Sequence, residues 1–331
     1  MLSRDADACF WIGRYVERAE ATARMVDVHY HATLESGLSD TASSDSPTPW
    51  DSLLAISHST EEFYSKHKLM SDSQLIYFFA FDTENPNSII SSWSRARENS
   101  RSIREQIASE MWEALNIFYL QLREWDVERV LAEGPHAFFQ RVENASHLFQ
   151  GILNRTLMMG ETRDWLDVGR FLERGDQTAR LLDVKYHDLL PAYREGEPES
   201  MEPLGVGSTL DMHGWIAVLK SVSAFEMYRK TYRGGILPAS VVDFLVLNSQ
   251  FPASVRHCVG RVEGCLKRIS GNGSGSISSA EPERVVGRLL ADLTYSRPDE
   301  IILEGLHEFL EGVQIRCAEV GTAITRAYLS Y

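Results

Sequence analysis

The sequence has few basic residues for its length. Lysine and arginine together number 33 against 47 aspartates and glutamates, which gives a formal net charge of −14 over 331 residues. A surface that binds nucleic acid neutralises the polyphosphate with lysine and arginine, so this charge argues against a nucleic-acid partner. It leaves peptides and protein partners open.

Long apolar runs and paired cysteines are also missing. No window approaches the roughly 20 apolar residues that a membrane span requires, and the run CFWI near the start is too short for the core of a signal peptide. We therefore expect a cytoplasmic protein with no membrane partner. The cysteines form no CxxC or zinc-ligand spacing, so we expect reduced and mostly buried thiols. They are Cys9, Cys258, Cys265 and Cys317.

Apolar residues recur at helical spacing along almost the whole chain, and no clear alternation of period two competes with them. Proline and glycine separate these runs, and three stretches rich in serine, glycine and proline predict surface loops at 36–49, 194–208 and 270–283. The sequence therefore predicts an all-α helical bundle. The predicted helices are 10–35, 51–65, 72–82, 87–124, 136–158, 165–190, 209–230, 240–269, 283–293 and 301–329.

One charged segment occurs twice, as WIGRYVERAEATARMVDVHYH at 11–31 and as DVGRFLERGDQTARLLDVKYH at 167–187. Other matching segments keep the same order in both halves, including two tryptophans that follow the charged segments and two EGxHxF stretches near the ends of the halves. The shared order predicts a tandem internal duplication with pseudo-two-fold symmetry. Its two α-helical repeats are 1–160 and 161–331, which together form one domain.

A helical wheel divides each copy of the charged segment into an apolar face and an ionisable stripe. A solvated face tolerates divergence, yet most charged positions are identical between the copies. Three interpretations remain open: a solvated face, a structural ion-pair network between helices, and a face that binds a ligand or partner. The stripe contains Gly13, Glu17, Glu20, Arg24, Asp27 and His31 in the first copy, and Gly169, Glu173, Asp176, Arg180, Asp183 and His187 in the second.

A second cluster of charge, formed by Arg97, Arg101 and Arg104, shares one face of the predicted helix 87–124 with apolar residues. Arginines in such a setting are expected to be partly buried and to need carboxylates beside them. The expected partners are Glu17, Glu20 and Asp27. The alternative is that the arginines face a groove and hold a carboxylate or phosphate from elsewhere.

Two kinds of enzyme site receive little support. Di-iron helical bundles bind their metals with two glutamates and two Glu-x-x-His pairs, and this chain contains the same number of each. Glycine follows the glutamate of each pair, however, so each glutamate is expected to precede the helix that carries its histidine. We expect no metal and no cofactor. Nucleophilic catalysis has little support either, because the sequence contains no Gly-x-Ser-x-Gly elbow and no cysteine beside a compelling histidine. The residues of the di-iron count are Glu17, Glu173, Glu133 with His136, and Glu304 with His307.

The opening MLSRDADACFWIGRYVERAEATAR resembles the bacterial alpha-E family, a helical domain named for its Glu-Arg motif. ARENSRSIRE at 96–105, EMWEALN at 110–116, DVGRFLERGDQTAR in the second half and GLHEFL at 305–310 are also similar to family landmarks, so the resemblance covers essentially the whole chain. The motif maps to two places, Glu17-Arg18 and Glu173-Arg174.

The resemblance implies an association with other proteins. Members of this family are encoded beside, or fused to, a circularly permuted ATP-grasp ligase, often with a transglutaminase-like protease and a proteasome-like peptidase. This implies an ATP-dependent pathway that forms or tags peptides. We expect a non-catalytic or accessory subunit that binds the ligase and its peptide substrate or product, with the two Glu-Arg helices around a central charged groove.

The competing hypothesis is a helical-bundle enzyme or metalloprotein that uses Glu17 and Glu173 with nearby histidines. No catalytic residue is assigned. The expected binding residues are Arg14, Glu17, Arg18, Glu20, Arg24, Arg97, Arg101, Arg104, Arg170, Glu173, Arg174, Asp176 and Arg180.

Overall fold

The computed structural model describes residues 1–35, 49–67, 70–189, 209–271 and 280–330. In this part of the chain every regular element is helical, which confirms the all-α prediction. The predicted loops 36–49 and 194–208 lie outside the described residues except for Pro49, which begins a helix. Of the predicted loop 270–283, residues 270–271 end one helix and 280–283 begin another, and the rest lie outside the described residues.

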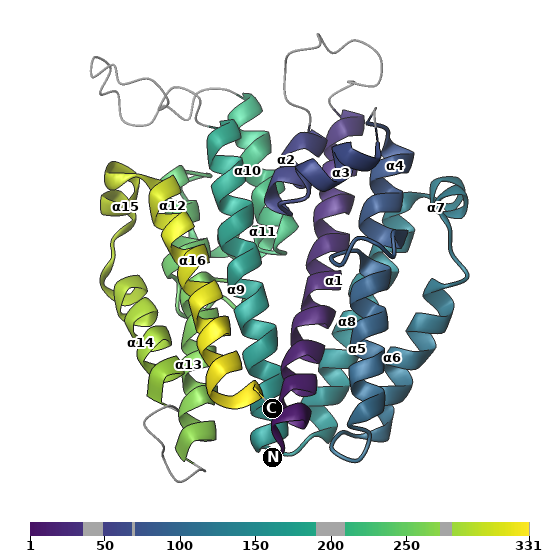
Figure 1. Cartoon of the computed structure of the whole chain (residues 1–331). Helices are drawn as coiled ribbons and strands as arrows, with labels where there is room; N and C mark the ends of the chain where they lie inside the picture. The colour runs from purple at the N-terminus through teal and green to yellow at the C-terminus, as the bar shows by residue number, and fades with distance from the viewer. Residues whose placement is uncertain (36–48, 68–69, 190–208, 272–279, 331) are drawn as a thin grey trace.

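Helices of the first half run antiparallel along a common direction, with shorter elements between them (Figure 1). A π-helical turn, η1, continues α4 directly. The elements are α1 (Ser3–Glu35), α2 (Pro49–Ile56), α3 (Thr60–Lys66), α4 (Asp72–Ile76), η1 (Tyr77–Phe81), α5 (Ile89–Ser102), α6 (Ser109–Leu122), α7 (Val127–Glu133) and α8 (Pro135–Thr156).

The second half repeats the same order of long helices, short helices and π-helical turns, and ends with one more such turn. The agreement extends to a left-handed residue after each first short helix, His58 and Ser223, with φ of 51° and 52°. The duplication itself stays a prediction. The elements are α9 (Glu161–Leu189), α10 (Thr209–Ser221), α11 (Phe225–Thr231), α12 (Pro238–Val242), η3 (Asp243–Leu247), α13 (Val255–Gly271), α14 (Ala280–Tyr295), α15 (Pro298–Glu304), α16 (Leu306–Ile324) and η5 (Thr325–Leu329).

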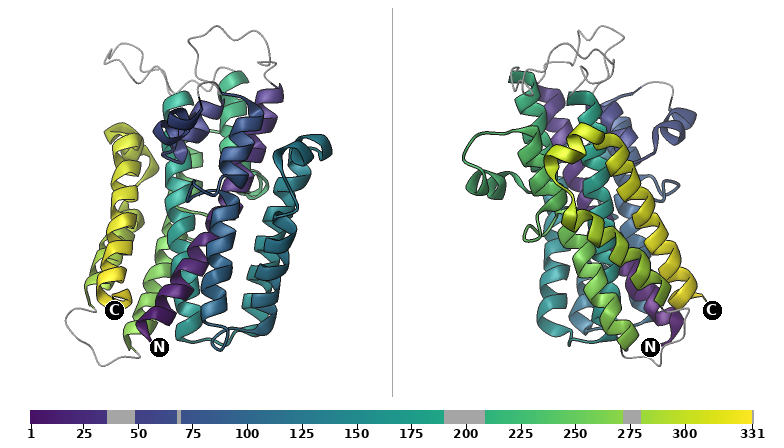
Figure 2. Two further views of the ribbon diagram at one scale, coloured as in Figure 1. Left: turned by 45° about the vertical axis from the view of Figure 1, so that its right-hand side comes forward. Right: turned by 90° about the vertical axis from the view of Figure 1, so that its left-hand side faces the viewer.

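The two long helices α1 and α9 lie side by side at the centre (Figure 1), and they contact each other more extensively than any other pair of elements. Helices α5, α6 and α8 pack on the side of α1, while α13, α14 and α16 pack on the side of α9 (Figure 2). The described part of each charged segment therefore lies mostly inside the bundle, although His31 is exposed.

Glycines allow α1 and α9 to approach each other closely. A Cβ added at Gly13 would overlap the backbone carbonyl of Leu166, and one added at Gly169 would overlap that of Phe10. A side chain at either position would push the helices apart. The glycines that open the two ionisable stripes thus mark the crossing point of the helices.

Buried apolar side chains surround this central pair. On α1 the residues Val16, Ala19, Ala23 and Val26 are fully buried. The largest buried side chains come from both halves and include Trp93, Trp165 and Trp215. All four cysteines are buried and free, as predicted. Among the described residues, none of the helices combines the length and the apolar character that a bilayer span requires.

Several predicted helices prove to be two. The predicted helix 87–124 ends at Ser102 and restarts at Ser109, with a turn between, and the predicted helix 240–269 is interrupted at 248–254. Proline is the first residue of α8, α12 and α15, as Pro135, Pro238 and Pro298, because its missing N–H needs no partner at that position.

Candidate functional site

The glutamates of the two Glu-Arg motifs exchange arginines across the central helix pair. Arg174 on α9 donates from Nη2 to Glu17 Oε2 at 2.7 Å, and Arg18 on α1 donates from Nε to Glu173 Oε1 at 2.7 Å. Each arginine uses two nitrogens on its glutamate, the bidentate geometry that favours arginine over lysine. Glu17 and Glu173 are almost completely buried, at 4% and 1% exposure.

Glu173 receives a second arginine. Arg14 donates from Nε to Glu173 Oε2 at 2.7 Å, and the amide of Gln177 adds a bond of 3.2 Å to Oε1. Burial alone would raise the pKa of the Glu173 carboxyl, but Arg18 and Arg14 together hold it well below its ordinary value. Glu173 therefore stays ionised inside the protein.

Arg170, which matches Arg14 in the other half, makes no such bond. Its Nη1 donates to the amide oxygen of Gln150, and the nearest carboxylate, Asp167, lies 3.7 Å from Nη2. The Nε atom of Arg170 is buried without a hydrogen-bond partner. Burial, together with the nearby Arg174, lowers the pKa of Arg170, so its charge is poorly compensated by the protein.

The next acid along each stripe also differs between the halves. Glu20 accepts hydrogen bonds from Arg24 at 2.6 Å and from Ser146 at 2.7 Å, and lies 3.2 Å from His147 Nε2. Asp176 accepts from Arg180 at 2.8 Å. Burial tends to raise the pKa of both carboxyls. At Glu20 the contacts with His147 and Arg24 outweigh burial and lower the pKa, whereas at Asp176 burial prevails and the pKa is raised.

The expected pairing of Arg97, Arg101 and Arg104 with Glu17, Glu20 and Asp27 is wrong. Arg97 donates to Asn116 and Glu98 and packs on Trp112 and Tyr119, and Arg101 donates to Glu98. Arg104 lies in the turn after α5, over Trp112, and is exposed. One reason is that α5 ends at Ser102, so the three arginines do not share one helix. Glu17 pairs instead with Arg174 of α9, Glu20 with Arg24 of α1 itself, and Asp27 with His136 of α8.

The residues that match a di-iron site do not come together as one either. Glu133 ends α7 and pairs with Arg129, whereas His136 begins α8 beyond a glycine with φ of 96°. Glu304 and His307 are divided in the same way at Gly305. Each histidine instead contacts a stripe aspartate, His136 to Asp27 and His307 to Asp183, both at 2.7 Å.

A pocket of about 410 Å³ opens between α1 and α9, against α8 and the segment that follows α10. Charged side chains form one wall, and Phe251, Pro252 and Ala253 form an apolar one. We call it the Arg170 pocket. It contains five of the predicted binding residues, which are Glu17, Glu20, Arg24, Arg170 and Arg174.

Matching residues of the other half line a smaller pocket of about 240 Å³ on the opposite side of the helix pair, where Arg14, Arg18, Glu173, Asp176 and Arg180 converge. Arg14, Asp176 and Arg180 also border a third pocket of about 410 Å³ beside α16. Over the described residues, the predicted site is thus distributed over separate pockets beside the crossing helices and not over a single central groove.

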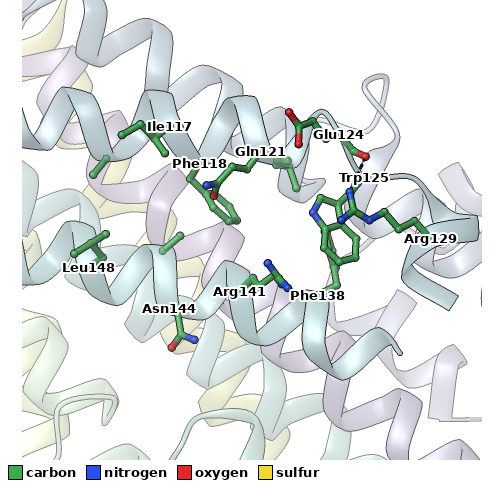
Figure 3. Close-up of a pocket in the computed structure, with 13 residues that line it drawn as sticks. Ile117, Phe118, Gln121, Glu124, Trp125, Arg129, Phe138, Arg141, Asn144 and Leu148 are labelled. Carbon is green, nitrogen blue, oxygen red and sulfur yellow. Dashed lines mark hydrogen bonds between the residues drawn. The ribbon is translucent and has the colours of Figure 1, made fainter. Parts of the chain in front are cut away.

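A further pocket, of about 510 Å³, lies away from the Glu-Arg helices, between α6 and α8 and beneath α7 (Figure 3). Ile117 and Leu148 border it and are 54% and 59% exposed. Arg129 and Arg141 lie over the ring of Trp125 at its far end, at 4.1 and 5.3 Å from the ring centroid. We call this feature the α6–α8 groove.

Sequence reasoning missed the residues of α8 that complete the site. Gln150, Ser146 and His147 face α1 and α9 although they lie more than 100 positions from Glu20 in the sequence. A comparison of the two halves could have indicated them. When His136 is aligned with His307, the polar residues Ser146, His147 and Gln150 of the first half match Cys317, Ala318 and Gly321 of the second, so polar side chains occur here in one half only.

Comparison with known proteins gives a family and several mycobacterial relatives. The alpha-E family, described as a predicted alpha-helical domain with a conserved ER motif, matches residues 1–329. Uncharacterised proteins of Mycobacterium bovis and Mycobacterium tuberculosis are each 23% identical over 348 residues, a match that covers 97% of this chain and 36% of the relative. The chain thus spans about a third of the length of these relatives. No solved structure matches it.

Proposed function

Because the chain belongs to the alpha-E family, we propose that it is an accessory, non-catalytic subunit of a cytoplasmic peptide-forming or peptide-tagging pathway. It binds a peptide by its carboxylate in the Arg170 pocket and docks on a circularly permuted ATP-grasp ligase. The same pathway, by family resemblance, includes a transglutaminase-like protease and a proteasome-like peptidase.

The observation that carries the peptide-binding part is the environment of Arg170. Its side chain borders a pocket and is 12% exposed, and its hydrogen bond goes to a neutral amide, with the Asp167 carboxylate 3.7 Å away, whereas Arg14 in the other half bonds a carboxylate directly. A carboxylate entering the pocket would supply the missing charge in a partly desolvated place, where a charge-assisted bond is strong. The apolar wall at Phe251 and Pro252 would then receive a small side chain.

The acids of the motif favour a binding role over catalysis. Glu17 and Glu173 are buried and each is already engaged by arginine. A carboxylate held in this way is a poor proton acceptor and a poor metal ligand, since both roles would require it to release its arginine. This arrangement disfavours the alternative of an enzyme built on these two glutamates.

Peptide binding is tested by calorimetry with short peptides that carry a free carboxyl terminus. We expect binding that is lost when the same peptides are amidated and weakened at least tenfold in Arg170→Gln. Arg261→Gln is the matched control, because Arg261 lies over the same Phe171 ring and near the same Asp167 but outside the pocket. Equal binding of free and amidated peptides would refute the carboxylate site.

The docking part rests on the α6–α8 groove. Exposed apolar side chains that gather at a groove are typical of interaction sites, and Ile117 and Leu148 lie exposed at one end of a groove that carries two arginines toward its other end (Figure 3). The mycobacterial relatives are almost three times as long as the matched region, so the helical unit occurs there with much further sequence. Both facts support a partner that covers the groove.

Docking is tested by co-expressing the chain with the circularly permuted ATP-grasp ligase of the same genome. The two proteins are expected to co-purify, and Ile117→Glu or Leu148→Glu is expected to abolish the complex. Ile315→Glu serves as control, since Ile315 is equally exposed but lies on α16. Failure of the unaltered proteins to co-purify would count against the ligase as partner without affecting the peptide result.

A further inference from the structure

Three potential metal ligands come together where α1 meets the start of α8. Asp27 and His31 are one helical turn apart on α1, and His136 is the second residue of α8. His136 Nδ1 lies 2.7 Å from Asp27 Oδ2, and His31 Nε2 lies 3.6 Å from Asp27 Oδ1. One ligand atom of each residue lies within 4.8 Å of the other two.

The aspartate of this cluster has unused bonding capacity. Asp27 is 8% exposed, and its Oδ1 atom is buried without a hydrogen-bond partner. Buried carboxylate oxygens are normally satisfied, so an unsatisfied one requires an explanation such as an ion. The imidazoles of His31 and His136 are 50% and 56% exposed, and an ion can therefore reach the cluster from solvent.

We propose that Asp27, His31 and His136 bind one divalent transition-metal ion of the zinc type. Two imidazole nitrogens and one carboxylate oxygen suit this class, whereas magnesium and calcium prefer oxygen ligands alone. Zinc binds such atoms at about 2.1 Å in a tetrahedron, which places the ligand atoms about 3.4 Å apart. With Asp27 Oδ1 as the carboxylate ligand, its spacing of 3.6 Å to His31 Nε2 already fits. His136, whose Nδ1 bonds the other oxygen, Oδ2, would give up that hydrogen bond and turn toward the ion.

The bound ion would connect α1 to α8 and would keep a coordination position for water or another ligand. It would replace the hydrogen bond between His136 and Asp27 with a stronger link that also uses Oδ1. The site is distinct from the Arg170 pocket, whose lining includes none of the three residues. The proposal is therefore independent of peptide binding.

The second half provides a contrast at matching positions. There Asp183 accepts from His307 through Oδ1 and from the amide of Gln314 through Oδ2, at 2.7 and 3.0 Å. Glu143 occupies the place of Gln314 in the first half, but it pairs with Arg24 at 3.1 Å and leaves Asp27 Oδ1 unsatisfied. Of these two aspartates, Asp27 is thus the one with an oxygen that accepts no hydrogen bond in the described part of the chain.

The test uses the full chain without an affinity tag, freed of metal by a chelator and titrated with Co²⁺, whose tetrahedral complexes absorb visible light, and then with Zn²⁺ as competitor. We expect one equivalent of Co²⁺ to produce the band and Zn²⁺ to remove it. His31→Ala and His136→Ala are each expected to weaken Co²⁺ binding at least tenfold. His307→Ala should leave it unchanged.

The proposal is overturned if the unaltered chain gives no band with millimolar Co²⁺, if both first-half variants keep the affinity, or if His307→Ala alone removes it. Far-ultraviolet circular dichroism checks that the variants are folded. If His136→Ala does not fold, His31→Ala decides the question, because the exposed His31 imidazole lies at the protein surface and its removal leaves the contact between α1 and α8 in place.

Discussion

Glu20 and Asp176 occupy matching positions on α1 and α9, yet the protein treats them differently. Ser146 and His147 of α8 bond to Glu20, while the matching residues of α16, Cys317 and Ala318, lie beside Asp176 as an apolar lining. The pKa of Glu20 is lowered and that of Asp176 is raised. A small change on the covering helix therefore decides whether a buried carboxylate is well solvated by the protein.

The covering helices α8 and α16 also explain the contrast between Arg14 and Arg170. Arg170 donates a hydrogen bond to Gln150 of α8. The matching position on α16 is Gly321, which has no side chain to bond Arg14, although a Cβ added there would lie 3.9 Å from Arg14 Nη1. Arg14 is thus left to bond Glu173. The half whose covering helix offers more polar side chains thus has the arginine that makes no hydrogen bond to a carboxylate.

The largest effect is expected from the glutamates of the motif. Glu173→Ala leaves Arg14 and Arg18 without their partner, and Glu17→Ala leaves Arg174, so each should lower the free energy of unfolding by about 3–5 kcal/mol, with Glu173 the larger. Urea denaturation measures the loss.

Glu98→Ala is the control for this comparison, because Glu98 makes its pairs with Arg97 and Arg101 at the surface and should cost under about 1 kcal/mol. A loss at Glu17 as small as that at Glu98 would mean that water reaches the exchanged pairs.

The next effect concerns the crossing point. Gly13→Ala or Gly169→Ala would place a methyl group against the opposite backbone and should cost about 1–3 kcal/mol or more. Thermal unfolding compares them with Gly151→Ala on α8, where an added Cβ meets nothing within 4 Å and helix propensity favours alanine by about 1 kcal/mol. Equal behaviour of the three variants would contradict a backbone contact between α1 and α9.

A smaller effect follows from making the first half resemble the second. Ser146→Cys combined with His147→Ala removes two bonds to Glu20, and we expect a loss of about 1–3 kcal/mol in unfolding free energy and an upward shift of the Glu20 pKa. Denaturation and carbon-detected NMR titration measure the two quantities. The Glu20 pKa should move toward that of Asp176; a value that does not move would show that the arginines Arg24 and Arg174 control it.

The smallest effect is a dependence on pH. The hydrogen bond with Glu20 raises the pKa of His147, and that with Asp183 raises the pKa of His307. The stabilisation is full below the ordinary histidine pKa of about 6.5 and is lost as pH rises through the higher folded-state value. After screening by solvent each should contribute under about 1 kcal/mol.

Unfolding free energies at pH 5.5 and 8.5 measure this term. The difference between them should shrink in His147→Gln and in His307→Gln, and shrink most when both are changed. An unchanged difference in the double variant would assign the pH dependence to other groups.

The sequence predicted the fold class and the charged helices because both leave periodic signals within one segment. It could not predict which partners face Glu17 or Glu20. Arg174 and Ser146 reach them from other helices, and that pairing depends on the crossing at Gly13 and on where α5 ends. The error at Arg97 has the same origin, since a six-residue turn after Ser102 is invisible to a helical wheel.

The exchange of arginines has a consequence for how the chain folds. Glu17 lies in residues 1–160 but obtains its counter-charge from Arg174, and Glu173 lies in 161–331 but obtains its own from Arg18. A separated half would bury a bare carboxylate or leave the helix exposed, and both are unfavourable. We therefore expect a single cooperative unfolding transition, with neither predicted repeat able to fold without the other.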